Sequence, residues 1–409
     1  MIPGAMPRFP RVSSTTDSLR DSVFSRLAAR AKERGGTIHP LHVGDTWLEP
    51  LEAARAEAQR TESTPRLHNY APVQGEPKLL DAIVRHVDRR AGVTLDRELV
   101  QVMSGATAGL GVVADALLEP GEEVLIPAPF WPLIRGTVRR RGGRAIEVPF
   151  FDRLADPGFD PEAALEAAIT PRTVALYVNT PHNPTGAMLP NRALDAIGRV
   201  AARHDLWIWS DEVYEDLWLT ERPPEPVWTR PDFRSRAIVV HSLSKAYGLA
   251  GARVGFAHGP AEAMVAIRGV QTFSTYCAPR PMQLGAARAL DEGGPWLAEA
   301  RRLYRAAAEK TAATFGVPRP DGGTFLFVDL RPFLRDGEDG MGFLERCLEA
   351  GVLLTPGAAS GTDYEHWARV CFTSVAPDAL DDALARLRGV IEGRVGGPAV
   401  GRSSLEGGA

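Results

Sequence analysis

Residues 242–256 read SLSKAYGLAGARVGF and come shortly after the apolar run 237–240, which is typical of a buried strand. Lys245 therefore stands just beyond a strand, with the hydroxyls of Ser242 and Ser244 beside it and Arg253 eight positions later. A lysine among small and apolar neighbours can attack a carbonyl, whereas a lone buried lysine more often pairs with an acid. Ser242 and Arg253 together suit an anionic group, because arginine offers two parallel donors.

Strand-like runs alternate with amphipathic helical runs over most of the chain, as in the helical stretch 192–204. This alternation predicts an α/β fold with a mostly parallel central sheet flanked by helices. The strand-like runs lie at residues 122–127, 174–178, 206–209 and 237–240.

The character of the sequence changes after about residue 290. Long runs rich in Ala, Arg and Leu, at 296–315 and 376–393, surround a short apolar run at 325–328, which predicts a smaller α+β domain. The expected units are an N-terminal arm with part of the small domain (1–45), a large domain (46–290), the small C-terminal domain (291–393) and a flexible tail (394–409).

The composition is that of an ordinary soluble globule, with 44% hydrophobic and 24% charged residues. Lys+Arg 47 and Asp+Glu 51 give a formal net charge of −4, which offers no general attraction to nucleic acid or an anionic membrane. No apolar run approaches the roughly 18 residues that would cross a bilayer. Because Cys277, Cys347 and Cys371 are too sparse for a disulfide framework, we expect a reducing, cytoplasmic location.

A segment of small residues, SGATAG at 104–109, follows another apolar run and precedes a helical one. The backbone N–H groups of Gly105, Ala106 and Thr107 would point at one spot at the start of that helix, where the helix dipole adds positive potential. The hydroxyl of Thr107 is a further donor. The segment predicts a phosphate site, although a helix start without a ligand is the alternative.

Two more polar segments follow strand-like runs. In NTPHNPTG at 179–186, prolines restrict the backbone around Asn183, whose amide can donate to a phenolate oxygen and meet a carboxylate. In SDEVY at 210–214, Asp211 ends a buried strand and needs a cation, with a helix N-cap as its alternative role. Tyr214 can lie over the same pocket. Because ligands collect beyond the carboxyl ends of parallel strands, we expect these segments to converge.

Together these segments meet the needs of pyridoxal 5′-phosphate (PLP), which requires a phosphate site, a lysine for its aldehyde and an acid for its ring nitrogen. By these motifs and their order, the chain resembles the class I/II aminotransferases of fold type I over about residues 35–390. The resemblance implies that the large domain binds PLP and that Lys245 is the Schiff-base lysine. It also implies that Asp211 pairs with the ring nitrogen and that Asn183 and Tyr214 contact the ring hydroxyl. The implied phosphate ligands are Gly105, Ala106, Thr107, Ser242 and Arg253.

The segment FWP at 130–132 occupies the place where such enzymes put an aromatic ring over the cofactor. We favour Trp131 over Phe130, because the stacking ring usually comes just before a proline. Arg369, in WARVCF at 367–372, matches the arginine that binds the substrate α-carboxylate, with a surface salt bridge as the alternative.

Two loop residues complete the resemblance. Gly44 resembles the glycine that lines the substrate site, and its alternative is a turn glycine. Tyr70 resembles the tyrosine that reaches the phosphate from the neighbouring subunit, and its alternative is a ring that packs a loop. The resemblance therefore implies a homodimer with shared active sites.

The expected activity is transamination, in which an amino group moves from an L-amino acid to a 2-oxo acid by a ping-pong mechanism with Lys245 as general base. A PLP-dependent lyase, cyclase or oxidase would use the same residues, and FWP resembles a segment of the aminocyclopropane-carboxylate synthases. A non-catalytic PLP sensor would carry an N-terminal DNA-binding domain, which the sequence does not suggest. No G-x-G-x-x-G follows a strand, which disfavours a dinucleotide-dependent dehydrogenase.

The substrate side chain is left open by the sequence. We expect Asp45, Thr46, Trp47 and the segment 272–276 to line its pocket. Arg268 and Arg280 are the candidates for binding a second carboxylate.

Overall fold

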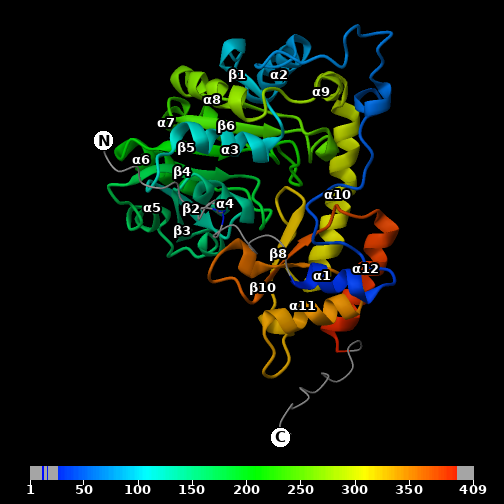
Figure 1. The fold of residues 1–409 in the computed structure, drawn as a ribbon. Coiled ribbons are helices and arrows are strands. Elements are labelled where there is room, and N and C mark those ends of the chain that lie inside the picture. Colours follow the sequence, from blue (N-terminus) through cyan, green and yellow to red (C-terminus); the bar gives the residue numbers. More distant parts are fainter. Residues whose placement is uncertain (1–11, 13–15, 17–25, 394–409) are drawn as a thin grey trace, which may run out of the picture.

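The computed structural model describes residues 12, 16 and 26–393, which form two parts of unequal size (Figure 1). The larger part holds a seven-stranded sheet of order β1-β7-β6-β5-β4-β2-β3. The neighbours from β6 to β3 are parallel, whereas β7 is antiparallel to both β6 and β1. The strands are β1 (Val100–Met103), β2 (Glu123–Ala128), β3 (Arg144–Pro149), β4 (Thr173–Asn179), β5 (Trp207–Asp211), β6 (Ala237–Ser242) and β7 (Gly255–His258).

Helices cover both faces of this sheet, since its central strands are apolar on both sides. The helices of one face are α3 (Ala106–Leu117), α4 (Pro132–Arg140) and α8 (Ala261–Ser274). Those of the other face are α5 (Pro161–Glu166), α6 (Asn191–Arg203) and α7 (Pro231–Arg234). The predicted α/β fold, with a mostly parallel sheet between helices, is confirmed.

The smaller part is built on a three-stranded antiparallel sheet of order β8-β10-β9. Figure 1 shows α10 (Gly294–Phe315) running from the larger part into the smaller one, with α2 (Pro77–Ala91) and α9 (Arg280–Glu292) near its start. The remaining elements are β8 (Phe325–Asp329), β9 (Thr355–Pro356), β10 (Trp367–Cys371), α1 (Arg26–Arg34), α11 (Gly340–Glu349) and α12 (Pro377–Ile391).

The N-terminal segment joins the smaller part, because His39 pairs with Val352 in a parallel bridge and α1 packs on α11. The domain boundaries at residues 45, 290 and 393 remain predictions. The predicted tail, 394–409, and most of the first 25 residues of the predicted N-terminal arm lie outside the described residues. Within the described part of the chain, no helix is both long and apolar enough to cross a membrane.

The parallel strands end at one edge of the larger sheet, and their last residues are polar. Asn179 ends β4, Asp211 ends β5 and Ser242 ends β6. Asn179 is the register partner of Asp211. The sheet thus brings together segments that lie more than 60 residues apart in the chain, as expected of the carboxyl edge of a parallel sheet.

Candidate active site

A cavity of about 250 Å³ opens at this edge, between the two parts of the molecule. It gathers side chains from the ends of β4, β5 and β6, from the starts of α3 and α4, and from β8 and β10. Its walls are formed by Gly44, Ala106, Thr107, Leu110, Trp131, Leu133, Asn179, Asn183, Asp211, Val213, Tyr214, Ser242, Ser244, Lys245, Ala250, Arg253, Phe325 and Arg369.

Lys245 reaches into the cavity three residues after β6, and its Nζ donates a hydrogen bond to the backbone oxygen of Gly44. Burial lowers the pKa of Lys245, and the positive charges of Arg253 and Arg369 act in the same direction, against the carboxylate of Asp45. A lowered pKa leaves more of the amine unprotonated near neutral pH. The amine is therefore suited to attack a carbonyl and to remove a proton.

Asp211 lies at the end of β5 and is only 4% exposed. Burial raises its pKa to about 6, while a hydrogen bond from the Tyr177 hydroxyl, 2.5 Å from Oδ2, opposes that rise. The carboxylate is therefore mostly ionised at neutral pH. A buried anion on a cavity wall is stabilised by a cationic group placed within that cavity.

The start of α3 forms an open concave site against Arg253. Gly105, the N-cap of α3, has φ of 79°, and a Cβ there would come within 2.5 Å of Arg253 Nη2. Arg253 is itself in the left-handed region, and its Nη1 donates to Ala250 O at 2.8 Å. Free N–H groups at a helix start, a guanidinium and the hydroxyls of Thr107 and Ser242 make this wall suitable for a phosphate.

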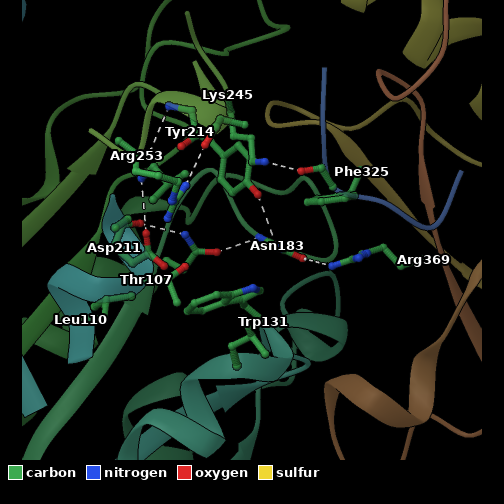
Figure 2. A pocket seen from close by; sticks show the side chains of 18 residues that line it. Thr107, Leu110, Trp131, Asn183, Asp211, Tyr214, Lys245, Arg253, Phe325 and Arg369 are labelled. Carbon is green, nitrogen blue, oxygen red and sulfur yellow. Dashed lines mark hydrogen bonds between the residues drawn. The ribbon is translucent and has the colours of Figure 1, made fainter. Parts of the chain in front are cut away.

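Asn183, Tyr214 and Arg369 form a buried hydrogen-bonded row across the cavity (Figure 2). Arg369 Nη1 donates to Asn183 Oδ1 at 3.1 Å, and Asn183 Nδ2 lies 3.4 Å from the Tyr214 hydroxyl. Arg369 also stacks over the Phe325 ring at 4.2 Å. No hydrogen-bond partner for Arg369 Nε is found among the described residues, so the guanidinium retains capacity for an anionic ligand.

The structure separates the two aromatic candidates of FWP. Trp131 is the N-cap residue of α4, and Figure 2 shows it on the wall of the cavity. Phe130 is fully buried in the core on the side of the sheet that α3, α4 and α8 cover. Of the pair, only Trp131 offers a ring surface to a ligand. Its half-buried indole lies on the wall formed by the start of α4.

Some sequence-predicted residues do not reach the cavity of their own chain. Tyr70 is 83% exposed, and its ring packs edge-on against the Tyr276 ring with the two ring centroids 5.2 Å apart. Asp45, Thr46, Trp47 and 272–276 are not among the residues that line the cavity of the single chain, so their place in the substrate pocket stays a prediction. Likewise, Arg268 donates to Glu98 O at 2.6 Å and Arg280 pairs with Glu76 at 2.5 Å, so neither lines the cavity.

Sequence reasoning also missed contributors, chiefly Phe325, Asn179 and Tyr177. From the sequence, Phe325 is expected only as part of a short apolar run. Asn179 Nδ2 donates to Asp211 O at 2.8 Å, and its Oδ1 accepts from the Asn183 backbone at 2.8 Å. A signal was present in the strand period of two, because Tyr177 and Asn179 share one face of β4 beside Asp211.

Comparison with known proteins places the chain in a family. The family model for aminotransferase class I and II matches residues 38–387. The arginine–pyruvate transaminase of Pseudomonas aeruginosa is 34% identical over 83% of this chain and 86% of its own length. The aspartate/prephenate aminotransferase of Thermus thermophilus is 31% identical over 93% of this chain and 98% of its own.

A solved structure agrees with this placement. The N-succinyldiaminopimelate aminotransferase of Mycobacterium tuberculosis superposes with a TM-score of 0.84 at 30% identity, over 93% of this chain and 100% of the other. These relatives are aminotransferases by name, which supports amino-group transfer rather than elimination, cyclisation or oxidation. The chain belongs to the class I and II aminotransferases, a family of PLP-dependent enzymes.

Proposed function

We propose that this aminotransferase binds PLP in the 250 Å³ cavity and moves an amino group between an L-amino acid and a 2-oxo acid in two half-reactions. The observation that carries the proposal is the placement of the Lys245 amine and the buried Asp211 carboxylate on walls of one cavity that also has an anion site at α3. The proposed cofactor ligands on this chain are Gly105, Ala106, Thr107, Trp131, Asn183, Asp211, Tyr214, Ser242, Lys245 and Arg253.

The residues present fit this cofactor. Gly105 leaves room that a side chain would fill, so a phosphate can approach both the helix start and Arg253. Asp211 requires a cation, and a protonated pyridine nitrogen is one. Tyr214 and Asn183 offer an O–H and an N–H to a phenolate oxygen.

When bound, PLP supplies a carbonyl that captures the amino group and a cationic ring that withdraws electrons from the substrate Cα. Arg369 binds the α-carboxylate and, with Asn183 and the Gly44 loop, orients the amino acid. Lys245 Nζ takes the Cα proton, helped by burial that lowers its pKa. Asp211 stays ionised and stabilises the positive charge beside it.

A test of the reaction type uses one amino acid without a 2-oxo acid. A transaminase should release at most one 2-oxo acid per active site, because the cofactor then holds the amino group and no acceptor is present to remove it. Rapid-quench analysis of 2-oxo acid, ammonia and peroxide measures this. Continued release of ammonia or peroxide would instead indicate a lyase or an oxidase.

Substitution of Arg369 tests the substrate carboxylate site. Arg369→Ala should raise KM for amino acids by roughly 10²-fold, because two hydrogen bonds to a charged group are lost. Affinity for PLP should change little, since Arg369 stands apart from the anion site at α3. Steady-state kinetics and cofactor titration measure the two effects. Arg369→Lys serves as the control that keeps the charge but loses the paired donors, and an unchanged KM would remove Arg369 from the substrate site.

We further propose a homodimer in which Tyr70 serves the active site of the neighbouring subunit. The support is the exposed aromatic surface formed by Tyr70, Phe273 and Tyr276, with exposed fractions of 83%, 93% and 44%. Exposed aromatic rings in one region are typical of protein interfaces. A cytoplasmic location remains our proposal, and the free thiols of all three cysteines support it.

A further inference from the structure

Tyr177 makes a short buried contact with the proposed partner of the cofactor ring. Its hydroxyl lies 2.5 Å from Asp211 Oδ2, and the two residues are 2% and 4% exposed. Tyr177 belongs to β4, whose residue Asn179 is the register partner of Asp211. Because side chains two apart share a face, Asn179 holds the backbone oxygen of Asp211 while Tyr177 holds its carboxylate.

Toward the ionised carboxylate of Asp211, the hydroxyl of Tyr177 acts as the donor. Burial and the neighbouring Asp211 carboxylate raise the pKa of Tyr177 well above its usual value, so the phenol keeps its proton. A phenol that donates to a carboxylate stabilises the ionised form of that carboxylate. The bond also fixes the orientation of the group, since a carboxylate anchored at one oxygen cannot rotate freely.

The other groups around Asp211 do not replace this bond. Among the residues that the structure describes, its Oδ1 receives one long contact, 3.4 Å from the Val213 backbone nitrogen. Tyr214 lies close enough for the Asp211 charge to raise its pKa but makes no hydrogen bond to the carboxylate among those found in the described residues. His241, on β6, lowers the pKa of Asp211 through its charge, while its Nδ1 is 2.5 Å from Glu215 Oε1.

We propose that Tyr177 is a positioning residue for transamination, one that orients the Asp211 carboxylate and holds it ionised against the cofactor's ring nitrogen. The proposal rests on the proposed function, because it requires Asp211 to face that nitrogen. It goes beyond the site residues inferred above, since Tyr177 does not itself line the cavity. Its effect passes entirely through Asp211.

The test compares Tyr177→Phe with Tyr364→Phe, which removes a buried hydroxyl that donates to Asp152 at 2.8 Å, outside the cavity. The full chain is freed of cofactor, and binding of pyridoxamine 5′-phosphate is followed by fluorescence over a range of pH. This probe has no aldehyde, so it measures the ring and phosphate sites without a bond to Lys245. In the unsubstituted chain, affinity should rise with pH until Asp211 is ionised, with a break near pH 6.

Tyr177→Phe should move this break to higher pH by about one unit or more, because loss of a hydrogen bond to a charged acceptor raises the pKa of that acceptor by about this amount. Binding should be several-fold weaker at pH 6 and little changed well above it, whereas Tyr364→Phe should reproduce the original profile. Titration of His241 and Lys245 is common to all three proteins. General damage to the fold would instead weaken binding at every pH.

A double substitution provides the second criterion. In an Asp211→Asn background, Tyr177→Phe should have no further effect on the pH profile, because the carboxylate through which it acts is gone. An unmoved break in the single variant, or equal effects in both backgrounds, would overturn the role of Tyr177. Failure of the unsubstituted chain to bind the probe would refute the proposed function instead, so the two failures are distinguishable.

Discussion

Lys245→Ala should lower the transamination rate by roughly 10²–10⁴-fold through loss of the general base alone. The reason lies in the cavity, where Lys245 is the only lysine on the described walls and its pKa is lowered by burial. Borohydride reduction of the PLP-loaded protein, followed by peptide mapping, should label Lys245 in the original chain and nothing in the variant. Four lysines make the map simple: Lys32, Lys78, Lys245 and Lys310.

Lys310→Ala is the matched control. Lys310 forms an exposed ion pair with Asp381 at 2.7 Å on the surface of the smaller part, and its loss should leave both rate and label unchanged. Lys245→Arg separates the effect of the positive charge from that of the reactive amine. A guanidinium carries the charge but stays protonated, so it can neither attack a carbonyl nor accept a proton. A label on any other lysine, or a rate that survives in Lys245→Ala, would refute the assignment.

That the four polar segments meet could be predicted from the sequence. Each segment is recognisable from its local pattern, and one rule of sheet topology brings the segments together. Lys245, Asp211 and Asn183 each follow an apolar run, and parallel strands end at a common edge. The start of α3 could be recognised from its small residues alone. To predict these parts of the site, it is not necessary to know which strands are neighbours in the sheet.

The features of the site that could not be predicted from the sequence depend on strand register and on contacts between the two parts of the molecule. Tyr177 looked like one more apolar residue of a strand, and its role exists only because β4 pairs with β5 with Asn179 opposite Asp211. Phe325 and Arg369 lie on the paired strands β8 and β10, where the register partner of Arg369 is Phe327, two residues from Phe325. Both reach the site only because the two parts of the molecule pack together. The expected role of the segment 272–276 in the substrate pocket stays a prediction, since this segment does not line the cavity of the single chain and Phe273 is 93% exposed there.

Asp211→Asn should reduce transamination by roughly 10²–10³-fold or more while leaving the fold intact, because the amide matches the carboxylate in size but has no charge to stabilise a cationic ring. The same change should stabilise the cofactor-free protein above about pH 6. Burial raises the folded-state pKa of Asp211 from 3.8 to about 6, so its favourable contribution is complete below pH 3.8 and is lost as pH rises through 6. At neutral pH, the buried charge therefore costs about 3 kcal/mol at most.

Thermal melts of the cofactor-free variant and the original chain across this range measure the effect, and the gap should widen in favour of Asp211→Asn as pH rises. Asp205→Asn, at a side chain 98% exposed, is the control and should change neither rate nor stability. A residue that destabilises the empty protein yet is needed for turnover is expected where a site is built for a charged ligand. If Asp211→Asn is equally active, Asp211 does not pair with a cationic ring, and if the variant is less stable at every pH, the buried charge of Asp211 does not destabilise the empty protein.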